Sequence, residues 1–169
     1  MLSRCRNGTF PRSSNPMKRI EVKLAVPVVA PLLDVIRALG EGPPVAAPGV
    51  VVPPDADPDL RSAWIGELAA AEATEVRALL GLFDEVFFRE GIVAFDAENA
   101  EVILRACSVL RLRLRESYLR AWGDDALESG DVETGPFEPG GHKAMACFLF
   151  LATVQELILQ HLGDNILTN

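Results

Sequence analysis

The segment 109–120, VLRLRLRESYLR, holds the residues whose type and spacing could do chemistry in this chain. Leucine and arginine alternate in it, and in a strand this pattern would point a row of guanidinium groups at an anionic partner. The preceding residues, AENAEVILRACSV, instead have apolar side chains three and four positions apart, which predicts a helix from about 97 to 121. On a helix, Arg111 and Arg115 share one flank, while Arg113 lies near the main apolar face. We therefore expect no continuous cationic row.

This predicted helix is apolar on two sides. A helix of this kind is expected in the centre of a bundle, with neighbours covering both sides. Its acids and bases are spaced for intrahelical pairs, Glu101 with Arg105 and Glu116 with Arg120. The acids of 124–138 are expected to form ion pairs with the remaining arginines. The two apolar faces are formed by Ile103, Ala106, Leu110, Leu114 and Ala121 on one side, and by Leu104, Leu112 and Leu119 on the other.

Five polar residues are candidates for a binding site: Arg111, Arg113, Arg115, Gln155 and Glu156. Arg113, Gln155 and Glu156 are predicted to point into apolar surroundings. We favour a buried network that fixes the register of the helices. The alternative is a pocket or partner site organised by Arg113.

Known catalytic and metal-binding patterns are not found in the sequence. His142 and His161 stand at opposite ends of one predicted helix, too far apart to bind one metal ion. Glu72 and Glu75 share a helix face but lack the Glu-x-x-His motifs of di-iron proteins. The stretch GPFEPGGHK lacks the Gly-Lys-Ser/Thr junction of a phosphate-binding loop. We therefore expect no enzyme, no cofactor and no metal site.

Composition and charge describe an acidic chain of one domain. It has 169 residues, 16 basic and 24 acidic, a net charge of -8 and a pI near 4.8. This balance disfavours nucleic acid and anionic membranes as partners. The longest apolar run, 144–152, is about half of a membrane span, and no secretory signal is apparent, so we expect a cytoplasmic protein. Cys107 and Cys147 lie in apolar helical patterns and are expected to be buried thiols.

The N-terminal part of the chain alternates strand and helix signals. Residues 1–16 read as a disordered lead-in, which leaves Met1 and Met17 as alternative starts. The alternation in RIEVKLAV predicts a strand, and PVVAPLLDVIRALG predicts a helix with prolines in its first turn and Gly40 as its stop. A Pro-rich loop, 41–58, follows. From the Asp57 cap and Pro58 the pattern is helical to about 89, either as one helix bent at 69–74 or as two.

The C-terminal part predicts a strand, IVAF, then the arginine helix capped by Asp96, an acidic loop at 123–140, an apolar helix ending at Gly163, and a tail at 164–169. The expected architecture is one domain, 17–163, of mainly α class. It would be a bundle of four to six helices, with a minimal two-stranded ribbon.

The stretches FDAENAEVILRACSVLRLRLRESYL and FLFLATVQELILQHL resemble an uncharacterised bacterial family, best represented in actinobacteria and known only as a domain of unknown function. The resemblance covers about 57–163, with a Leu-Arg-Leu segment around Arg111 and a Gln-Glu pair at Gln155 and Glu156. Val154 replaces the family's leucine, and the family's tryptophan is absent from the last helix. The resemblance implies an all-helical cytoplasmic protein without known catalytic residues. Because members are often encoded beside the adaptor of the Clp protease, it also implies a role near proteolysis.

The functional expectation is a non-enzymatic helical module for protein interaction or regulation. Two helices are more hydrophobic than a small monomer requires, which predicts a homodimer or a protein partner. The alternative class is a binding protein or enzyme that holds a small anionic ligand between helices, with Arg111, Arg113 or Arg115.

Overall fold

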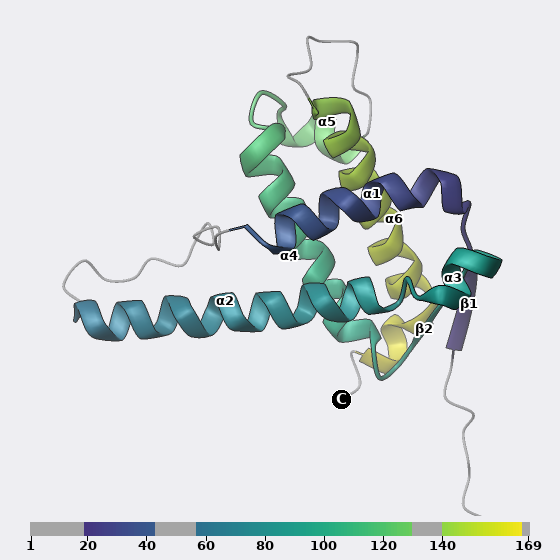
Figure 1. Ribbon diagram of the computed structural model, residues 1–169, viewed down its shortest axis with the longest axis horizontal. Helices are drawn as coiled ribbons and strands as arrows, with labels where there is room; N and C mark the ends of the chain where they lie inside the picture. Colours follow the sequence, from purple (N-terminus) through teal and green to yellow (C-terminus); the bar gives the residue numbers. More distant parts are fainter. Residues whose placement is uncertain (1–18, 43–56, 130–139, 167–169) are drawn as a thin grey trace, which may run out of the picture.

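The computed structural model describes residues 19–42, 57–129 and 140–166. Six helices and a two-stranded antiparallel ribbon are found in these ranges (Figure 1). The prediction of a mainly α bundle of four to six helices with a minimal ribbon is confirmed. The elements in chain order are β1 (Arg19–Lys23), α1 (Val26–Gly40), α2 (Pro58–Gly81), α3 (Glu85–Glu90), β2 (Ile92–Asp96), α4 (Ala100–Tyr118), α5 (Asp124–Ser129) and α6 (Gly141–Ile166).

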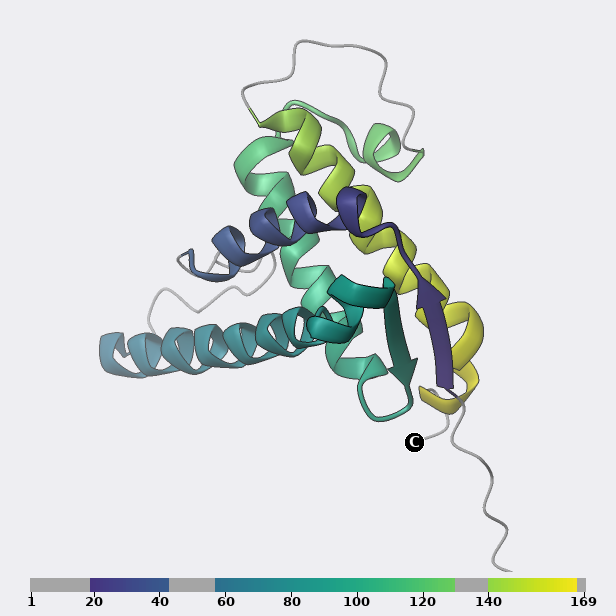
Figure 2. The same ribbon diagram turned by 45° about the vertical axis from the view of Figure 1, so that its right-hand side comes forward.

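Helix α4, the arginine helix, is the central element and contacts α1, α2 and α6 (Figure 2). The predicted main face is buried within the helix, with Ile103, Leu110 and Leu114 all 0% exposed. Ala121, predicted on the same face, is exposed and lies beyond Tyr118, the last residue of α4. The opposite face is covered only in part, because Leu104 is half-buried and Leu112 is 39% exposed. Leu112 lines a surface pocket instead of packing against a helix, so the expected cover on both sides is wrong at this position.

The ribbon pairs β1 with β2, placing Ile20 opposite Phe95. Phe95 and Val93 are buried against the helices, as the alternating pattern of a half-buried strand requires. Gly91, just before β2, has φ +73, and a Cβ atom there would lie 2.5 Å from the Leu24 carbonyl oxygen. Since the Gly91 carbonyl also accepts a 2.7 Å hydrogen bond from the Leu24 amide, only glycine allows this close approach.

Helix α1 differs from its prediction at both ends. It begins at Val26, so that Pro31 lies inside the helix and not in its first turn. Pro31 and Pro27 are both exposed, and water can reach the Pro27 carbonyl that has no amide partner. Gly40 is the last helical residue and not the stop after it. Its role is close packing, because a Cβ atom there would meet Val76 of α2 at 2.8 Å.

The segment 58–90 forms two helices, but they separate at a different place from the expected one. The alanine-rich stretch 69–74 continues α2 without a break, as the high helix propensity of alanine favours. The chain leaves the helix after Gly81, where Asp84 caps α3 by accepting hydrogen bonds from the amides of Val86 and Phe87 at 2.8 and 3.0 Å.

The first half of α2 projects beyond the bundle (Figures 1 and 2). Leu60 and Trp64, expected as part of the apolar packing set, are 72% and 44% exposed. The prediction of their burial is wrong because apolar spacing indicates a helix but cannot show how far its neighbours extend along it. Only the second half, with Val76 and Leu79, packs into the core.

Three further boundaries are corrected. Asp96 caps the turn before α4 and not the helix itself, which begins at Ala100. Helix α5 occupies the first part of the predicted acidic loop, and α6 continues past Gly163 to Ile166 because Gly163 is buried within the helix. The expectations for 1–16 and Met17, and those for most of the loops 41–58 and 123–140 and the end of the tail, concern residues outside the described ranges.

Candidate functional site

The arginines of the alternating segment leave α4 in different directions. Arg113 points toward α1 and α2, whereas Arg111 and Arg115 line a pocket with residues of α5 and α6. Residues two positions apart on a helix are separated by about 200°, which sends neighbouring arginines of this segment to opposite sides. The alternation therefore gives two separate environments rather than one basic face.

Arg113 forms a buried network inside the bundle, in which its Nε, like that of Arg111, donates to no described residue. Its Nη2 donates to Glu72 Oε2 at 2.6 Å and its Nη1 donates to the Leu39 carbonyl at 2.6 Å. Arg113 and Glu72 are 5% and 7% exposed. Leu39 lies in the last turn of α1, where its carbonyl also accepts a 3.3 Å hydrogen bond from the Gly42 amide, and Arg113 supplies a further donor at this helix end. The contacts are those of a residue that joins α1, α2 and α4.

Arg111 forms an open network on the other side of α4. Its Nη1 donates to Gln155 Oε1 at 2.8 Å, and its guanidinium carbon lies 4.4 Å from the centre of the Phe148 ring, a cation–π geometry. Gln155 Nε2 in turn donates to Ser108 Oγ at 2.8 Å and to the Leu104 carbonyl at 3.2 Å. The buried Nε of Arg111 donates to no residue in the described ranges.

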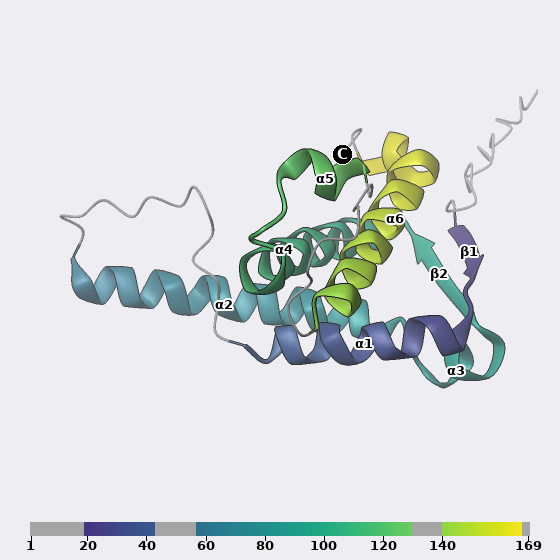
Figure 3. The same ribbon diagram turned by 90° about the horizontal axis from the view of Figure 1, so that it is seen from above.

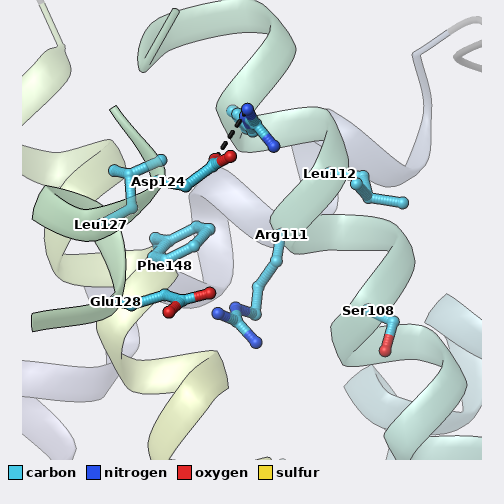
Figure 4. Close-up of a pocket in the computed structure, with 8 residues that line it drawn as sticks. Ser108, Arg111, Leu112, Asp124, Leu127, Glu128 and Phe148 are labelled. Carbon is cyan, nitrogen blue, oxygen red and sulfur yellow. Dashed lines mark ion pairs between the residues drawn. The ribbon is translucent and has the colours of Figure 1, made fainter. Parts of the chain in front are cut away.

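A pocket of about 300 Å³ lies between α4, α5 and α6 beside this network (Figure 4). Arg115, on its wall, forms a 2.7 Å ion pair with Asp124. Figure 4 shows the Arg111 side chain reaching from α4 toward Phe148 and Glu128. The pocket is lined by Ser108, Arg111, Leu112, Arg115, Asp124, Leu127, Glu128 and Phe148.

The pocket carries two positive and two negative side chains, not the excess of positive charge that the sequence suggested. Arg115 and Asp124 form an ion pair, as expected for the acids of 124–138. Arg111 forms no ion pair with a described carboxylate, and no described residue pairs with Glu128. Among the described residues, one cation and one anion without ion-pair partners thus line the same cavity.

The five predicted site residues do not converge. Arg111 and Arg115 line the pocket, and Gln155 holds Arg111. Arg113 lies in the buried network on the far side of α4. Glu156 was expected to point inward, which is wrong: it is exposed and accepts a 2.8 Å hydrogen bond from Gln160.

Several pocket residues were not predicted as site residues. Phe148 and Leu127 look like core residues in the sequence, and Glu128 is one acid among many in its segment. Only the folded arrangement brings these residues to the flank of α4 that carries Arg111 and Arg115. The shared flank of the two arginines was the one available signal.

The two described thiols are closed off from chemistry. Cys107 and Cys147 are both 0% exposed, and burial raises the pKa of each to about 12. The charges of Arg111 and Lys143 oppose this effect only in part. Both thiols therefore stay protonated at neutral pH and do not act as nucleophiles. In the part of the chain that is described, no three His, Cys, Asp or Glu residues gather in a possible metal site.

Helix α6 is long and apolar enough between Gly141 and Gly163 to cross a membrane, by length and composition alone. The core helix of a soluble protein meets the same criteria. The buried residues Cys147, Leu151 and Ile158 of α6 belong to the same core as the buried face of α4. These contacts are those of a core helix.

A second candidate surface is the projecting part of α2, residues 58–71, which we call the α2 arm (Figure 3). Leu60, Trp64 and Leu68 are spaced four residues apart and so lie along one face of the helix. Leu60 is 72% exposed, Trp64 44% and the adjacent Ile65 46%. Apolar side chains gathered on one exposed face make the arm a candidate surface for binding.

The comparisons with known proteins found no relative of this chain. No family model, no curated protein and no solved structure matches the chain. The resemblance drawn from 57–163 therefore stays a prediction, and the functional argument depends on the two surfaces alone.

Proposed function

We propose that this protein is a non-enzymatic interaction module that binds an amphipathic helix of a protein partner through the α2 arm. The observation that carries the proposal is the exposed apolar face of Leu60, Trp64 and Ile65 on a helix that extends beyond its own bundle. Helix-on-helix recognition uses apolar anchors three to four residues apart, which is the spacing of Leu60, Trp64 and Leu68.

Charge indicates which helix fits. The exposed acids Asp57, Asp59 and Glu67 stand at and beside the arm, and the whole chain has a net charge of -8. The arm's cation, Arg61, is half-buried and already has an interaction. A partner helix with apolar anchors and basic flanks is complementary to this surface, whereas a second copy of the chain would bring the same acids and the same net charge.

A titration with a designed peptide tests the proposal. The probe is a helical peptide with leucines along one face and lysines on the flanks. The readout is the tryptophan fluorescence of Trp122→Phe, because Trp64 and Trp122 are the two tryptophans of the chain. We expect saturable binding that blue-shifts the emission, because Trp64 leaves water on docking. A peptide of the same composition in scrambled order controls for attraction between a cationic peptide and an acidic protein.

Two matched variants locate the site. Leu60→Glu places a charge on the arm and should weaken peptide binding at least about tenfold. Leu159→Glu places the same charge at a similarly exposed leucine of α6, 54% exposed, and should leave binding unchanged. Both changes are at exposed positions and are expected to alter the free energy of unfolding by no more than about 0.5 kcal/mol.

Two results would contradict the proposal. Equal affinity for the ordered and scrambled peptides would mean that the arm does not recognise an amphipathic helix and that charge alone accounts for binding. A dimer in sedimentation equilibrium that Leu60→Glu converts to a monomer would assign the arm to a second copy instead. No contact of the described residues speaks for the link to Clp-type proteolysis, so the proposed partner is defined by its chemistry alone.

A further inference from the structure

We infer that the pocket between α4, α5 and α6 binds a free α-amino acid with an apolar side chain, in its zwitterionic form. This site is separate from the α2 arm and does not depend on it. Its lining combines one cation and one anion that lack ion-pair partners in the described ranges with apolar walls (Figure 4).

The cation of the site is Arg111, which is held in place but not neutralised. Gln155 accepts from its Nη1 at 2.8 Å, and the Phe148 ring supports the guanidinium from one side at 4.4 Å. The buried Nε has no acceptor among the described residues. Because this Nε is enclosed by protein, as the Nε of Arg113 also is, a carboxylate in the pocket would accept from the Nη groups of Arg111.

The anion of the site is Glu128 of α5, which lines the same pocket as Arg111, and Figure 4 marks no ion pair between them. The remaining charges, Arg115 and Asp124, are paired with each other at 2.7 Å. A ligand with only a negative charge would gain from Arg111 and be repelled by Glu128, and a ligand with only a positive charge would meet the reverse. A ligand that carries both charges on neighbouring atoms satisfies both.

The size and walls of the pocket define the rest of the ligand. Its volume of about 300 Å³ is at the small end of ligand sites, which run from about 300 to 1,000 Å³. Phe148, Leu127 and Leu112 present apolar atoms to the cavity. A single amino acid, with its carboxylate on Arg111, its ammonium on Glu128 and an apolar side chain on these walls, matches the three features together.

Thermal-shift and calorimetric titrations with three compounds test this inference. The compounds are L-leucine, N-acetyl-L-leucine, which keeps only the negative charge, and L-leucine amide, which keeps only the positive one. We expect L-leucine to raise the melting temperature and to bind at least about tenfold more tightly than either analogue, because each analogue leaves one charged side chain without its partner.

Charge-removing variants reverse this preference in a defined way. With Glu128→Gln, L-leucine should bind at least about tenfold more weakly, while N-acetyl-L-leucine should bind more tightly than to the original protein. With Arg111→Gln, L-leucine and N-acetyl-L-leucine should both lose affinity. Glu128 is exposed, so Glu128→Gln is expected to fold and keeps the test decisive if Arg111→Gln is unstable. Arg120→Gln, which removes an arginine outside the pocket, is the matched control and should leave the affinities for all three compounds unchanged.

The inference is overturned by either of two results. N-acetyl-L-leucine binding as tightly as L-leucine would make the pocket a plain anion site. No binding of any of the three would mean that the pocket holds no free amino acid, whatever the stability of Glu128→Gln.

Discussion

Two arginines of the same helix, two positions apart, have opposite surroundings. Arg113 is 5% exposed and bonded to a carboxylate and to a helix-end carbonyl, both at 2.6 Å. Arg111 is half-buried, leans on an aromatic ring and an amide, and faces a cavity. The first guanidinium is neutralised by a buried carboxylate of its own chain, and the second has a charge that no described carboxylate neutralises.

The difference teaches how to separate a structural arginine from a binding one. A structural arginine has its charge neutralised by its own chain, and removing it leaves a buried carboxylate alone. A binding arginine is held by neutral groups that fix its position and preserve its charge for something else. In this chain Glu72 marks the first kind and Gln155 the second.

The largest expected effect is on stability at Arg113. We expect Arg113→Met to lower the free energy of unfolding by about 3 to 5 kcal/mol, because it leaves the carboxylate of Glu72 buried without its partner. Adding Glu72→Leu should restore most of the loss. Urea unfolding of the two single variants and the double variant measures this coupling.

Arg111→Met is the matched control for this prediction. It removes an equally long side chain from the same helix but leaves no carboxylate unpaired, so we expect a loss of only about 1 kcal/mol. Equal losses for the two arginines would contradict the division into a structural and a binding side.

The next effect is a dependence of the free energy of unfolding on pH, which comes from the two buried thiols of the core. The pKa of Cys107 and of Cys147 is about 12 in the folded protein, against a usual value of 9.0. Above the unfolded pKa, only the unfolded thiols lose protons, so stability is complete below about pH 9 and falls as the pH rises toward 12. From about pH 8 to about pH 10 the loss should be roughly 1 to 2 kcal/mol for each thiol.

The measurement is a comparison of urea unfolding at the two pH values in the original protein and in Cys107→Ala/Cys147→Ala. Other groups that titrate in this range are the same in both proteins, so the difference between the two pH effects isolates the thiols. An identical pH effect in both proteins would show that the thiols are not desolvated as their burial indicates.

Much of this fold could be predicted from the sequence, because local pattern determines it. The strand pair, the cap at Asp57 and the helical nature of the arginine segment follow from periodicity and from residue types that act over three or four positions. The predicted pairs Glu101–Arg105 and Glu116–Arg120 are likewise local, and both are present.

The site could not be predicted in the same way, because it depends on which elements meet. Phe148 and Gln155 lie about forty residues from Arg111 in the sequence, and nothing local relates them to it. The exposure of Leu60 and Trp64 has the same origin: their spacing indicates an apolar face, but the length of the neighbouring helices decides whether that face is covered. Arg113 was correctly placed near the main face, while its partner Glu72 could not be identified from spacing.

The smallest expected effect is at Arg105, which repeats the chemistry of Arg113 nearer the solvent. Arg105 Nε donates to Glu75 of α2 at 2.7 Å, and its Nη1 pairs with Glu101. The bond to Glu75 raises the pKa of Arg105, but the Arg105 side chain is 48% exposed, and water and salt screen the pair. We therefore expect Arg105→Met to cost no more than about 1 kcal/mol.

Salt separates the two ion pairs between α2 and α4. Raising the sodium chloride concentration to about 1 M should remove most of the effect of Arg105→Met and leave that of Arg113→Met almost unchanged, because only the Arg105 pair is open to solvent. Urea unfolding of both variants at low and high salt measures this. A loss at Arg105 that is large and insensitive to salt would mean that burial of Glu75, 17% exposed, dominates the pair. The structural side of α4 would then extend a further two turns toward its N-terminus.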